Sequence, residues 1–351
     1  MNFIDTNKPV LVTGATGYVA GRLVEKLLTE GFIVHAAVRT PNDKDKTQYL
    51  DALAAKLPGE IKYFKSDLLE EGSYDEAMKG CELVFHTASP FIRVIKDPQK
   101  DLVDPAKKGT KNVLGSANKT ESVKRVVVTS SCAAIYGDGV DVLEMPNQEL
   151  TEDFWNTSSS LDHQPYSFSK TVAEKEAWEV NKAQDRWDLV TINPSFVLGP
   201  GINPHASSES YSIMKQIGKG DFKMGAPEFN IGCIDVRDLA EAHFQAGTKA
   251  EAKGRYIISG TNSGFLEIAG FIKNKFPNYK IGTKKLPKWM LWLMAPSVGM
   301  TRKEVSKNVG FPWKANNSKS IKDLGMKYRP LEGTVTEFFG QLVEAGEIPK
   351  I

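Results

Sequence analysis

Six short apolar runs, separated by helical patterns, place the strongest constraint on the fold of this chain. They have the length and residue types of buried β-strands: "PVLVT" (9–13), "FIVHAAV" (32–38), "IKYFK" (61–65), "ELVFHTA" (82–88), "RVVVTS" (125–130) and "DLVTIN" (188–193). Apolar residues recur at helical spacing between the first two runs, at Ala20, Leu23, Val24, Leu27 and Leu28. Continuous apolar strands that alternate with helices indicate a doubly wound parallel sheet with helices on both faces, so we expect an α/β fold.

The glycine-rich stretch "VTGATGYVAG" follows the first strand and opens the first helix. Gly14 and Gly17 lie in the turn, where a backbone that passes close to a pyrophosphate needs residues without a side chain. The start of the helix adds unpaired N–H groups and the positive end of its dipole, and the small Ala20 lets the helix pack closely on the strand. The stretch therefore predicts a Rossmann-type dinucleotide site. The residues expected to contact the cofactor here are Gly14, Thr16, Gly17, Tyr18 and Val19.

The end of the second strand, "HAAVRT", indicates which dinucleotide is bound. An NAD site of this fold commonly carries an acid about 20 residues after the glycines, which binds the ribose 2′-hydroxyl. This chain has Arg39 there, followed by Lys44, and a guanidinium suits a 2′-phosphate, so we expect NADP(H). Asp67, after the third strand, is placed to accept a hydrogen bond from the adenine amino group; alternatively, it caps a helix that begins near Ser73.

A tyrosine and a lysine stand four residues apart at two places, in "YSFSK" (166–170) and "YSIMK" (211–215). Positions i and i+4 share one face of a helix, and the run after Pro165 has a helical pattern. Lys170 can therefore lie beside Tyr166, where its positive charge favours the phenolate. The spacing alone does not decide between the two pairs, because short motifs recur by chance.

Taken in order, the motifs of this chain resemble those of the extended short-chain dehydrogenase/reductases. More narrowly, they resemble the branch of dihydroflavonol reductases, cinnamoyl-CoA reductases and microbial NADPH-dependent carbonyl reductases. The motifs are "TGATGYVAG", "SDL", "VFHTASP", "VVVTSS", "YSFSK", "INPSFVLGP" (192–200) and "IDVRDLAEAH" (234–243), and they span most of the chain. The resemblance implies an NADPH-dependent carbonyl reductase that converts an aldehyde or ketone into an alcohol.

The resemblance also selects the first tyrosine–lysine pair, because the family's Tyr-x-x-x-Lys follows the serine-bearing strand. It implies that Tyr166 acts as general acid towards the carbonyl oxygen while hydride arrives from NADPH. Lys170 would support the tyrosine and bind the nicotinamide ribose, and Tyr211 would at most line a pocket. Further cofactor contacts are implied for Leu68, Thr87, Ala88, Pro194 and Val197.

The catalytic serine has two possible positions in "TSSCAAIYG" (129–137). Alignment on the reductase branch puts it at Ser131, whereas alignment on sugar-nucleotide epimerases puts it at Cys132. A thiol is a poor substitute for the hydroxyl, so Ser131 is favoured, with Ser130 as a neighbour that lines the cofactor. Cys132 is then a small buried apolar residue. Outside this motif, we expect His86 to be a packed histidine of its strand and Asp238 to be a helix cap.

The regular strand and helix pattern ends after residue 194, where stretches such as "LGPGINP" (198–204) carry proline and glycine. A chain of 351 residues also exceeds the size of about 250–300 residues at which single cores stop growing. We therefore expect residues 1–194, with part of 225–260, to form an NADP-binding Rossmann domain. Residues 195–224 and 261–351 are expected to form a smaller substrate-binding domain.

Charge, cysteines and histidines argue against several other classes of protein. With 45 basic and 43 acidic side chains the net charge is only +2, so neither nucleic acid nor an anionic membrane is expected as a partner. The three cysteines lack a Cys-x-x-Cys pair and the five histidines lack a His-Glu-x-x-His motif, so we expect no disulfide and no metal. A cytoplasmic location is the expectation, because the cysteines fit a reducing setting and "MNFIDTNKPV" has no signal-peptide pattern. The protein is expected to be a monomer or homodimer. "WMLWLMA" (289–295), too short to span a bilayer, is expected to be a buried helix or a lid segment.

The expected substrate pocket combines segments 89–95, 132–140, 159–165 and 204–213. These segments mix aromatic and aliphatic side chains with small polar ones and contain no cluster of arginine or lysine, which favours a modest aldehyde or ketone. Tyr136 and "DHQPYSFSK" differ from the plant enzymes of the branch, so a general carbonyl reductase is expected. The alternatives are a sugar-nucleotide epimerase or dehydratase, which would need an acid after the second strand, and a non-catalytic NADP-sensing binding protein, which would commonly lack the tyrosine and lysine.

Overall fold

The computed structural model describes residues 3–89 and 95–351, and these form a seven-stranded sheet and a three-stranded sheet. The large sheet is parallel throughout, in the order β3-β2-β1-β4-β5-β6-β9. Its strands are β1 (Pro9–Thr13), β2 (Ile33–Val38), β3 (Glu60–Lys65), β4 (Leu83–His86), β5 (Arg125–Thr129), β6 (Asp188–Pro194) and β9 (Gly254–Ile258). The order 3-2-1-4-5-6 is that of a Rossmann fold, so the expected doubly wound α/β sheet is confirmed. Residues 90–94 of the expected pocket segment 89–95 lie outside the described residues.

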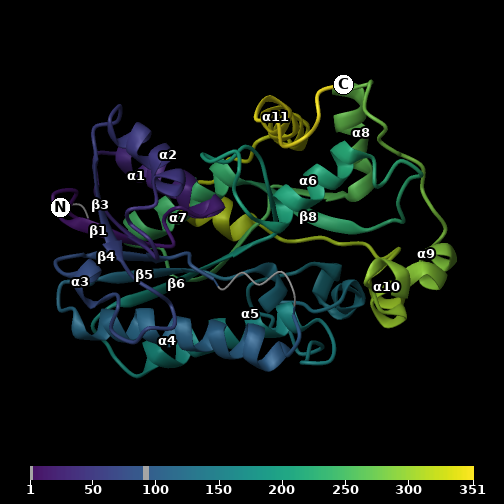
Figure 1. Ribbon diagram of the computed structural model, residues 1–351. Helices are drawn as coiled ribbons and strands as arrows, with labels where there is room; N and C mark the ends of the chain where they lie inside the picture. The colour runs from purple at the N-terminus through teal and green to yellow at the C-terminus, as the bar shows by residue number, and fades with distance from the viewer. Residues whose placement is uncertain (1–2, 90–94) are drawn as a thin grey trace.

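Helices cover both faces of the large sheet (Figure 1). One face carries α1 (Tyr18–Thr29), α2 (Lys44–Ala54) and α7 (Val236–Thr248), and the other carries α3 (Asp75–Met78), α4 (Asp104–Lys119) and α5 (Pro165–Lys182). Successive strand side chains point to opposite faces. In β1, accordingly, Val10 and Val12 join the core beneath α1 and α7, whereas Leu11 joins the core beneath α3, α4 and α5. The continuous apolar runs are needed because both faces are buried.

The small sheet has the order β10-β8-β7 and is built from β7 (Phe196–Leu198), β8 (Asn230–Asp235) and β10 (Thr261–Gly264). It packs with α6 (Glu209–Lys219), α8 (Phe265–Lys275) and α11 (Leu331–Glu344) around a second core. Within 225–260, β9 is a strand of the large sheet and α7 packs on that sheet, whereas β8 is a strand of the small sheet. Leu324 and Met326 also pack in the large core. The expected domain boundaries stay a prediction.

Asp235, and not Asp238, caps α7. Asp235 is the last residue of β8, and its side chain accepts a hydrogen bond from the Arg237 N–H at 2.8 Å. Asp238 lies in the first turn of the helix and instead accepts from the Arg329 N–H at 2.7 Å. The expected cap was therefore wrong by three positions, because the strand runs directly into the helix without a loop.

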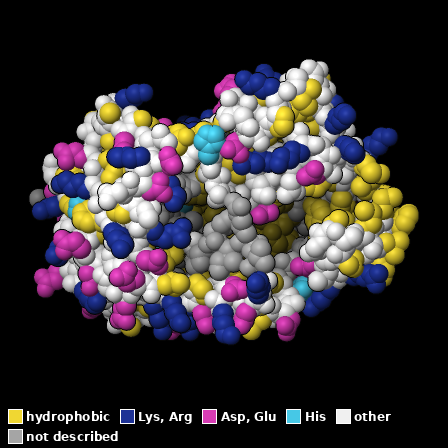
Figure 2. Space-filling model, viewed as in Figure 1, with side chains coloured by type: hydrophobic (Ala, Val, Ile, Leu, Met, Phe, Trp, Pro, Cys, Tyr) yellow, Lys and Arg dark blue, Asp and Glu magenta, His cyan; other side chains and the backbone are white. Residues whose placement is uncertain are grey.

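The apolar run 289–295 forms α9 (Lys288–Met294) and leads into the short 3-10 helix η5 (Ala295–Val298). No side chain of α9 is buried, and Trp289 and Leu293 are 63% and 56% exposed, so the expected buried helix was wrong. The helix is short and mostly apolar, and its Leu291 packs against a small cluster of buried residues that includes Val305 of α10 (Arg302–Asn308). Apolar side chains accordingly gather at the right edge of Figure 2. None of the helices in the described part of the chain has the length and apolar character needed to span a bilayer.

The remaining helical segments are short 3-10 or π-helical stretches of three to six residues. They are η1 (Gln99–Val103), η2 (Cys132–Ala134), η3 (Gly139–Glu144), η4 (Pro146–Gln148) and η6 (Ser320–Leu324). Of these, η2 follows β5 closely, and the two candidate positions of the catalytic serine, Ser131 and Cys132, lie at its start.

Candidate active site

The glycine turn joins β1 to α1 at the carboxyl edge of the large sheet. Gly14 has a φ of +64°, and a Cβ added there would lie 3.1 Å from the Ala88 Cβ at the end of β4. Gly17 precedes α1 and donates its N–H to the Gly14 carbonyl at 2.8 Å. A non-glycine residue at Gly14 would be strained and would crowd Ala88, so this turn before the N-terminus of α1 requires a glycine.

The predicted cofactor contacts on α1 differ in where their side chains point. Tyr18 is buried, and its hydroxyl donates to the Gly199 carbonyl at 2.6 Å, within the second core. Val19 is half-buried and packs against both cores, whereas Thr16 lies partly exposed in the turn. The Tyr18 side chain thus ties α1 to the small-sheet part, and only its backbone is left for a cofactor.

Arg39, Lys44, Asp67 and Leu68 lie beyond the ends of β2 and β3. Arg39 is exposed directly after β2, while Lys44 opens α2 and forms an ion pair with Asp51 at 3.0 Å. Burial raises the pKa of the Tyr74 hydroxyl. The negative charge of Asp67 raises it further and the positive charge of Arg39 lowers it, so both charges lie near Tyr74. Asp67 accepts from the Leu69 N–H at 2.8 Å and caps that turn, whereas α3 begins only at Asp75. The alternative of a cap for a helix near Ser73 was therefore wrong.

Thr13 and His86 fix the turn that follows β4. They are paired in the register of β1 and β4, and the Thr13 Oγ1 lies 3.0 Å from the His86 Nδ1. The same Oγ1 accepts from the N–H groups of Thr87 and Ala88, at 3.1 and 3.0 Å. His86 is packed in its strand as expected, and burial together with the charge of Lys170 lowers its pKa to about 4. Thr13 was missed by the sequence reading.

Tyr166 and Lys170 lie one turn apart near the start of α5. The Tyr166 side chain is 52% exposed, and the Lys170 Nζ lies 5.7 Å from the centre of its ring. Lys170 donates to the Ser89 Oγ, after β4, at 3.1 Å. This contact draws the ammonium towards the carboxyl edge of the sheet, where the glycine turn also lies.

Ser131 and Cys132 have different surroundings at the end of β5. The half-buried Ser131 caps η2, with its Oγ accepting from the Ala133 N–H at 3.1 Å. Cys132 is buried, and its thiol donates to the Asn193 carbonyl at 3.3 Å. Burial raises the pKa of this thiol. Cys132 thus has the packing expected of a small apolar residue, and the Ser131 hydroxyl is the more accessible of the two groups.

The second tyrosine–lysine pair lies away from this edge. Tyr211 is buried in the second core, where its hydroxyl donates to the Asn203 carbonyl at 2.9 Å and its ring contacts those of Tyr18 and Phe338. Lys215 forms an ion pair with Glu347. Tyr211 is therefore a core residue, and the suggestion that it lines a pocket was wrong.

A cavity behind Lys170 brings together the ends of β4 and β5 with α4 and α5. Three of the predicted residues line it, namely Leu68, Ala88 and Lys170, and so do Ser130, His86 and Glu174. Pro194 ends β6 and is buried, and Val197 lies in β7 between the two cores. Figure 2 shows the molecule hollowed between the part built on the large sheet and the part built on the small sheet.

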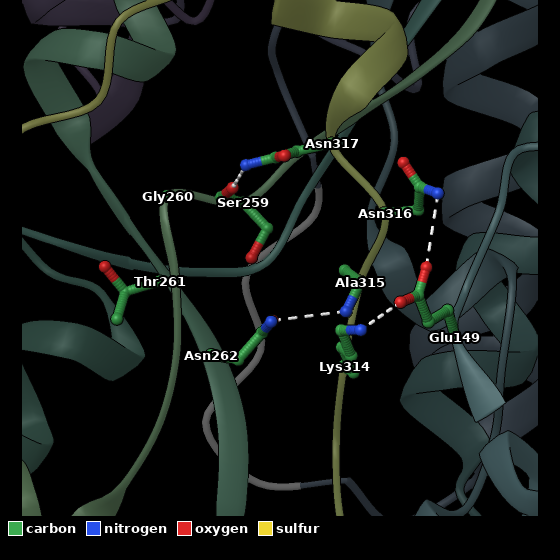
Figure 3. Close-up of a pocket in the computed structure, with 9 residues that line it drawn as sticks. All are labelled: Glu149, Ser259, Gly260, Thr261, Asn262, Lys314, Ala315, Asn316 and Asn317. Atoms are coloured by element: carbon green, nitrogen blue, oxygen red, sulfur yellow. Dashed lines mark hydrogen bonds and ion pairs between the residues drawn. The ribbon is translucent and has the colours of Figure 1, made fainter. Parts of the chain in front are cut away.

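Another cavity, of about 310 Å³, lies at the end of β9 (Figure 3). Its polar side chains bind one another: Glu149 accepts from the Asn316 Nδ2 at 3.2 Å and pairs with Lys314. Asn262 accepts from the Ala315 N–H at 3.1 Å. None of the predicted site residues lines this cavity.

All three cysteines of residues 3–89 and 95–351 are buried and unpaired. In the same ranges, no three His, Cys, Asp or Glu side chains gather in a way that could hold a metal ion.

Comparison with known proteins places the chain among reductases. Residues 10–259 match the model of the NAD dependent epimerase/dehydratase family. The cinnamoyl-CoA reductase CAD2 of Medicago truncatula is 37% identical over 342 residues, which cover 95% of each chain. The tetraketide alpha-pyrone reductase 1 of Arabidopsis thaliana is 32% identical over 345 residues, which cover 97% of each chain.

Among solved structures, the chain is similar to the yeast methylglyoxal/isovaleraldehyde reductase Gre2 complexed with NADPH. The TM-score is 0.78 at 28% sequence identity, and the match covers 97% of this chain and 99% of that one. The likeness therefore extends over both sheets and not only over the Rossmann part.

Proposed function

The chain belongs to the NAD dependent epimerase/dehydratase family, the extended short-chain dehydrogenase/reductases, and we propose that it is an NADPH-dependent carbonyl reductase. Relatives that match nearly its whole length are reductases, which makes an NAD(P)-dependent oxidoreductase of this chain. The observation that carries the finer proposal is the Tyr166–Lys170 pair, whose ammonium is held beside the phenol ring by Ser89.

The residues at the carboxyl edge fit NADPH. The positive φ of Gly14 and its close approach to Ala88 require a residue without a side chain in the turn before the N-terminus of α1, where a pyrophosphate is favoured. Arg39 is exposed after β2, where a 2′-phosphate would lie, and the Gre2 structure to which this chain is similar holds NADPH. When bound, the cofactor supplies the hydride.

The chain's own residues manage the proton. Tyr166 donates its phenolic proton to the carbonyl oxygen of the substrate, and the resulting phenolate is stabilised by the ammonium of Lys170. Ser131 donates a hydrogen bond to the same oxygen and orients the carbonyl group. A hydroxyl at this position suits the task better than the thiol of Cys132, which is buried and already bonded to Asn193.

The proposed substrate is a modest aldehyde or ketone with an apolar body. Figure 2 shows apolar side chains within the hollow between the two sheet parts. Gre2 is a methylglyoxal/isovaleraldehyde reductase, so these two compounds are the first probes to use.

Purified protein mixed with NADPH, and in parallel with NADH, against methylglyoxal, isovaleraldehyde, simple ketones and UDP-sugars tests the proposal. We expect loss of the nicotinamide absorbance with NADPH and at least one aldehyde or ketone. Conversion of a UDP-sugar without net loss of absorbance would instead identify an epimerase. Binding of NADPH with no turnover of any compound would identify a non-catalytic binding protein.

A further inference from the structure

Glu174 is a carboxylate buried behind the proposed active site. It lies one helical turn after Lys170 in α5, and only 1% of its surface is exposed. A buried carboxylate is costly unless several donors surround it. In the described part of the chain its donors come from β6, β9, its own helix and Ser130 just after β5, and Arg255 donates to both carboxylate oxygens.

The Oε1 atom anchors α5 to the far side of the sheet. It accepts from the Arg255 Nε of β9 at 2.6 Å, from the Thr191 Oγ1 of β6 at 3.2 Å and from the Trp178 Nε1 at 3.4 Å. Arg255 is itself held by the Glu152 carbonyl at 2.7 Å. The guanidinium of Arg255 neutralises the buried charge of Glu174. None of the three donors to Oε1 belongs to the serine pair 130–131.

The Oε2 atom faces the serine-bearing loop. It accepts from the Ser130 hydroxyl, from the Asn193 Nδ2 at 2.7 Å and, more weakly, from the Arg255 Nη2 at 3.4 Å. The same Nδ2 donates to the Ser131 carbonyl at 3.1 Å, and the Asn193 carbonyl accepts the Cys132 thiol at 3.3 Å. Asn193 therefore holds Ser131 and Cys132 from one side, and Glu174 holds both Asn193 and Ser130.

We propose that Glu174 and Asn193 are positioning residues for carbonyl reduction, which fix the backbone of Ser131 so that its hydroxyl meets the carbonyl oxygen. The inference rests on the proposed function. Helix α5 carries Glu174 as well as Tyr166 and Lys170. The Glu174 carboxylate, which holds Ser131 through Asn193, therefore also fixes the position of Ser131 relative to Tyr166, the proton donor. Neither residue touches substrate; both act through Ser131.

Two variants and a matched control separate positioning from simple stabilisation. Asn193→Ala removes the side-chain hydrogen bond to the Ser131 carbonyl, and Glu174→Gln removes the charge of the buried carboxylate. The control, Trp178→Phe, removes one donor from Oε1 only. We expect kcat with isovaleraldehyde or the best carbonyl of the panel to fall up to about 100-fold in the first two, because small misplacements of a reacting group are that costly. NADPH affinity, followed by cofactor fluorescence, should stay within about twofold. Trp178→Phe should keep kcat and lose only thermal stability.

The deciding measurement is a double-mutant cycle with Ser131→Ala. If Asn193 acts through Ser131, Asn193→Ala lowers kcat in the unsubstituted background and changes it by no more than about twofold when Ser131 is already Ala. An equal loss in both backgrounds, or no loss at all, overturns the positioning role. Should Glu174→Gln fail to fold because Arg255 loses its partner, the neutral Asn193→Ala variant carries the test.

The same cycle distinguishes failure of this inference from failure of the proposed function. If the unsubstituted protein reduces no carbonyl, the proposed function falls and the positioning role with it. If Ser131→Ala is as active as an unsubstituted protein that does reduce carbonyls, the role of Ser131 and the positioning role are overturned, while the reductase function stands. If Ser131→Ala is impaired while Asn193→Ala has full activity, only the positioning role is overturned.

Discussion

The ammonium of Lys170 lies 5.7 Å from the centre of the Tyr166 ring, whereas the equally spaced Tyr211 and Lys215 make separate contacts in and around the second core. Both pairs are i and i+4 on a helix, so their spacing is the same. The difference is tertiary: α5 starts at the carboxyl edge of the large sheet, while α6 packs against α11 and the small sheet. The two tyrosines therefore form a matched pair for mutagenesis.

Tyr166→Phe should lower turnover by about 10²- to 10⁴-fold, the usual contribution of a general acid. Because the Tyr166 side chain is half-exposed, the thermal stability and NADPH binding of the Tyr166→Phe variant should be close to those of the unsubstituted protein. Tyr211→Phe should show the opposite: normal turnover, but a free energy of unfolding lower by about 1 kcal/mol, because a buried hydrogen bond to the Asn203 carbonyl is lost. Steady-state kinetics and urea unfolding of both variants check this, and an active Tyr166→Phe enzyme would remove the tyrosine from the mechanism.

Arg39→Ala should weaken NADPH binding by about 10- to 100-fold, the worth of a hydrogen bond to a charged group. NADH lacks the 2′-phosphate, so its affinity should hardly change. Lys46→Ala is a suitable control, because Lys46 is an exposed lysine nearby that pairs with Asp43 at 2.9 Å. Fluorescence titration with both cofactors gives the ratio, and an equal loss for NADPH and NADH would exclude a contact with the 2′-phosphate.

Gly14→Ala should destabilise the fold by about 1–2 kcal/mol, the cost of a left-handed backbone in a residue with a side chain. The new methyl group would also press on Ala88, 3.1 Å away, so NADPH affinity should fall. Gly115→Ala in α4 is the matched control: its φ is not positive and no atom lies within 4 Å of the added carbon, so it should stabilise the protein by about 0.4–1 kcal/mol. Chemical unfolding of both variants would show opposite signs; the same sign in both would contradict the role given to the turn.

The large sheet and the glycine turn could be predicted because their sequence signals, continuous apolar runs and closely spaced glycines, lie within short stretches of the chain. Contacts between distant segments could not be predicted in this way. Glu174 has the sequence context of an ordinary helix surface residue, yet β5, β6 and β9 close over it. Thr13 and His86 meet only because of the register of β1 and β4. The choice between Ser131 and Cys132 likewise depends on Asn193, which lies in another strand.

The buried His86 predicts a loss of stability in mild acid. Burial and the charge of Lys170 lower its pKa to about 4, whereas an unfolded histidine has a pKa of about 6.5. Between these two values the unfolded state binds more protons than the folded one, so the free energy of unfolding falls as the pH falls from about 6.5 to 4. Above pH 6.5 both states are neutral and the effect vanishes. His243, whose pKa burial also lowers to about 4, adds a second contribution of the same sign.

Each histidine should contribute up to about 1.4 kcal/mol per pH unit within this window. His35, whose pKa burial also lowers, acts in the same direction. His86→Asn, whose amide can approach Thr13 Oγ1 in place of Nδ1, removes the His86 contribution. Urea unfolding at pH 7.5, 6.0 and 5.0 should therefore give a shallower pH dependence for this variant than for the unsubstituted protein. An unchanged slope would show that His86 titrates in the folded protein as it does in the unfolded chain, contrary to its burial beside Lys170.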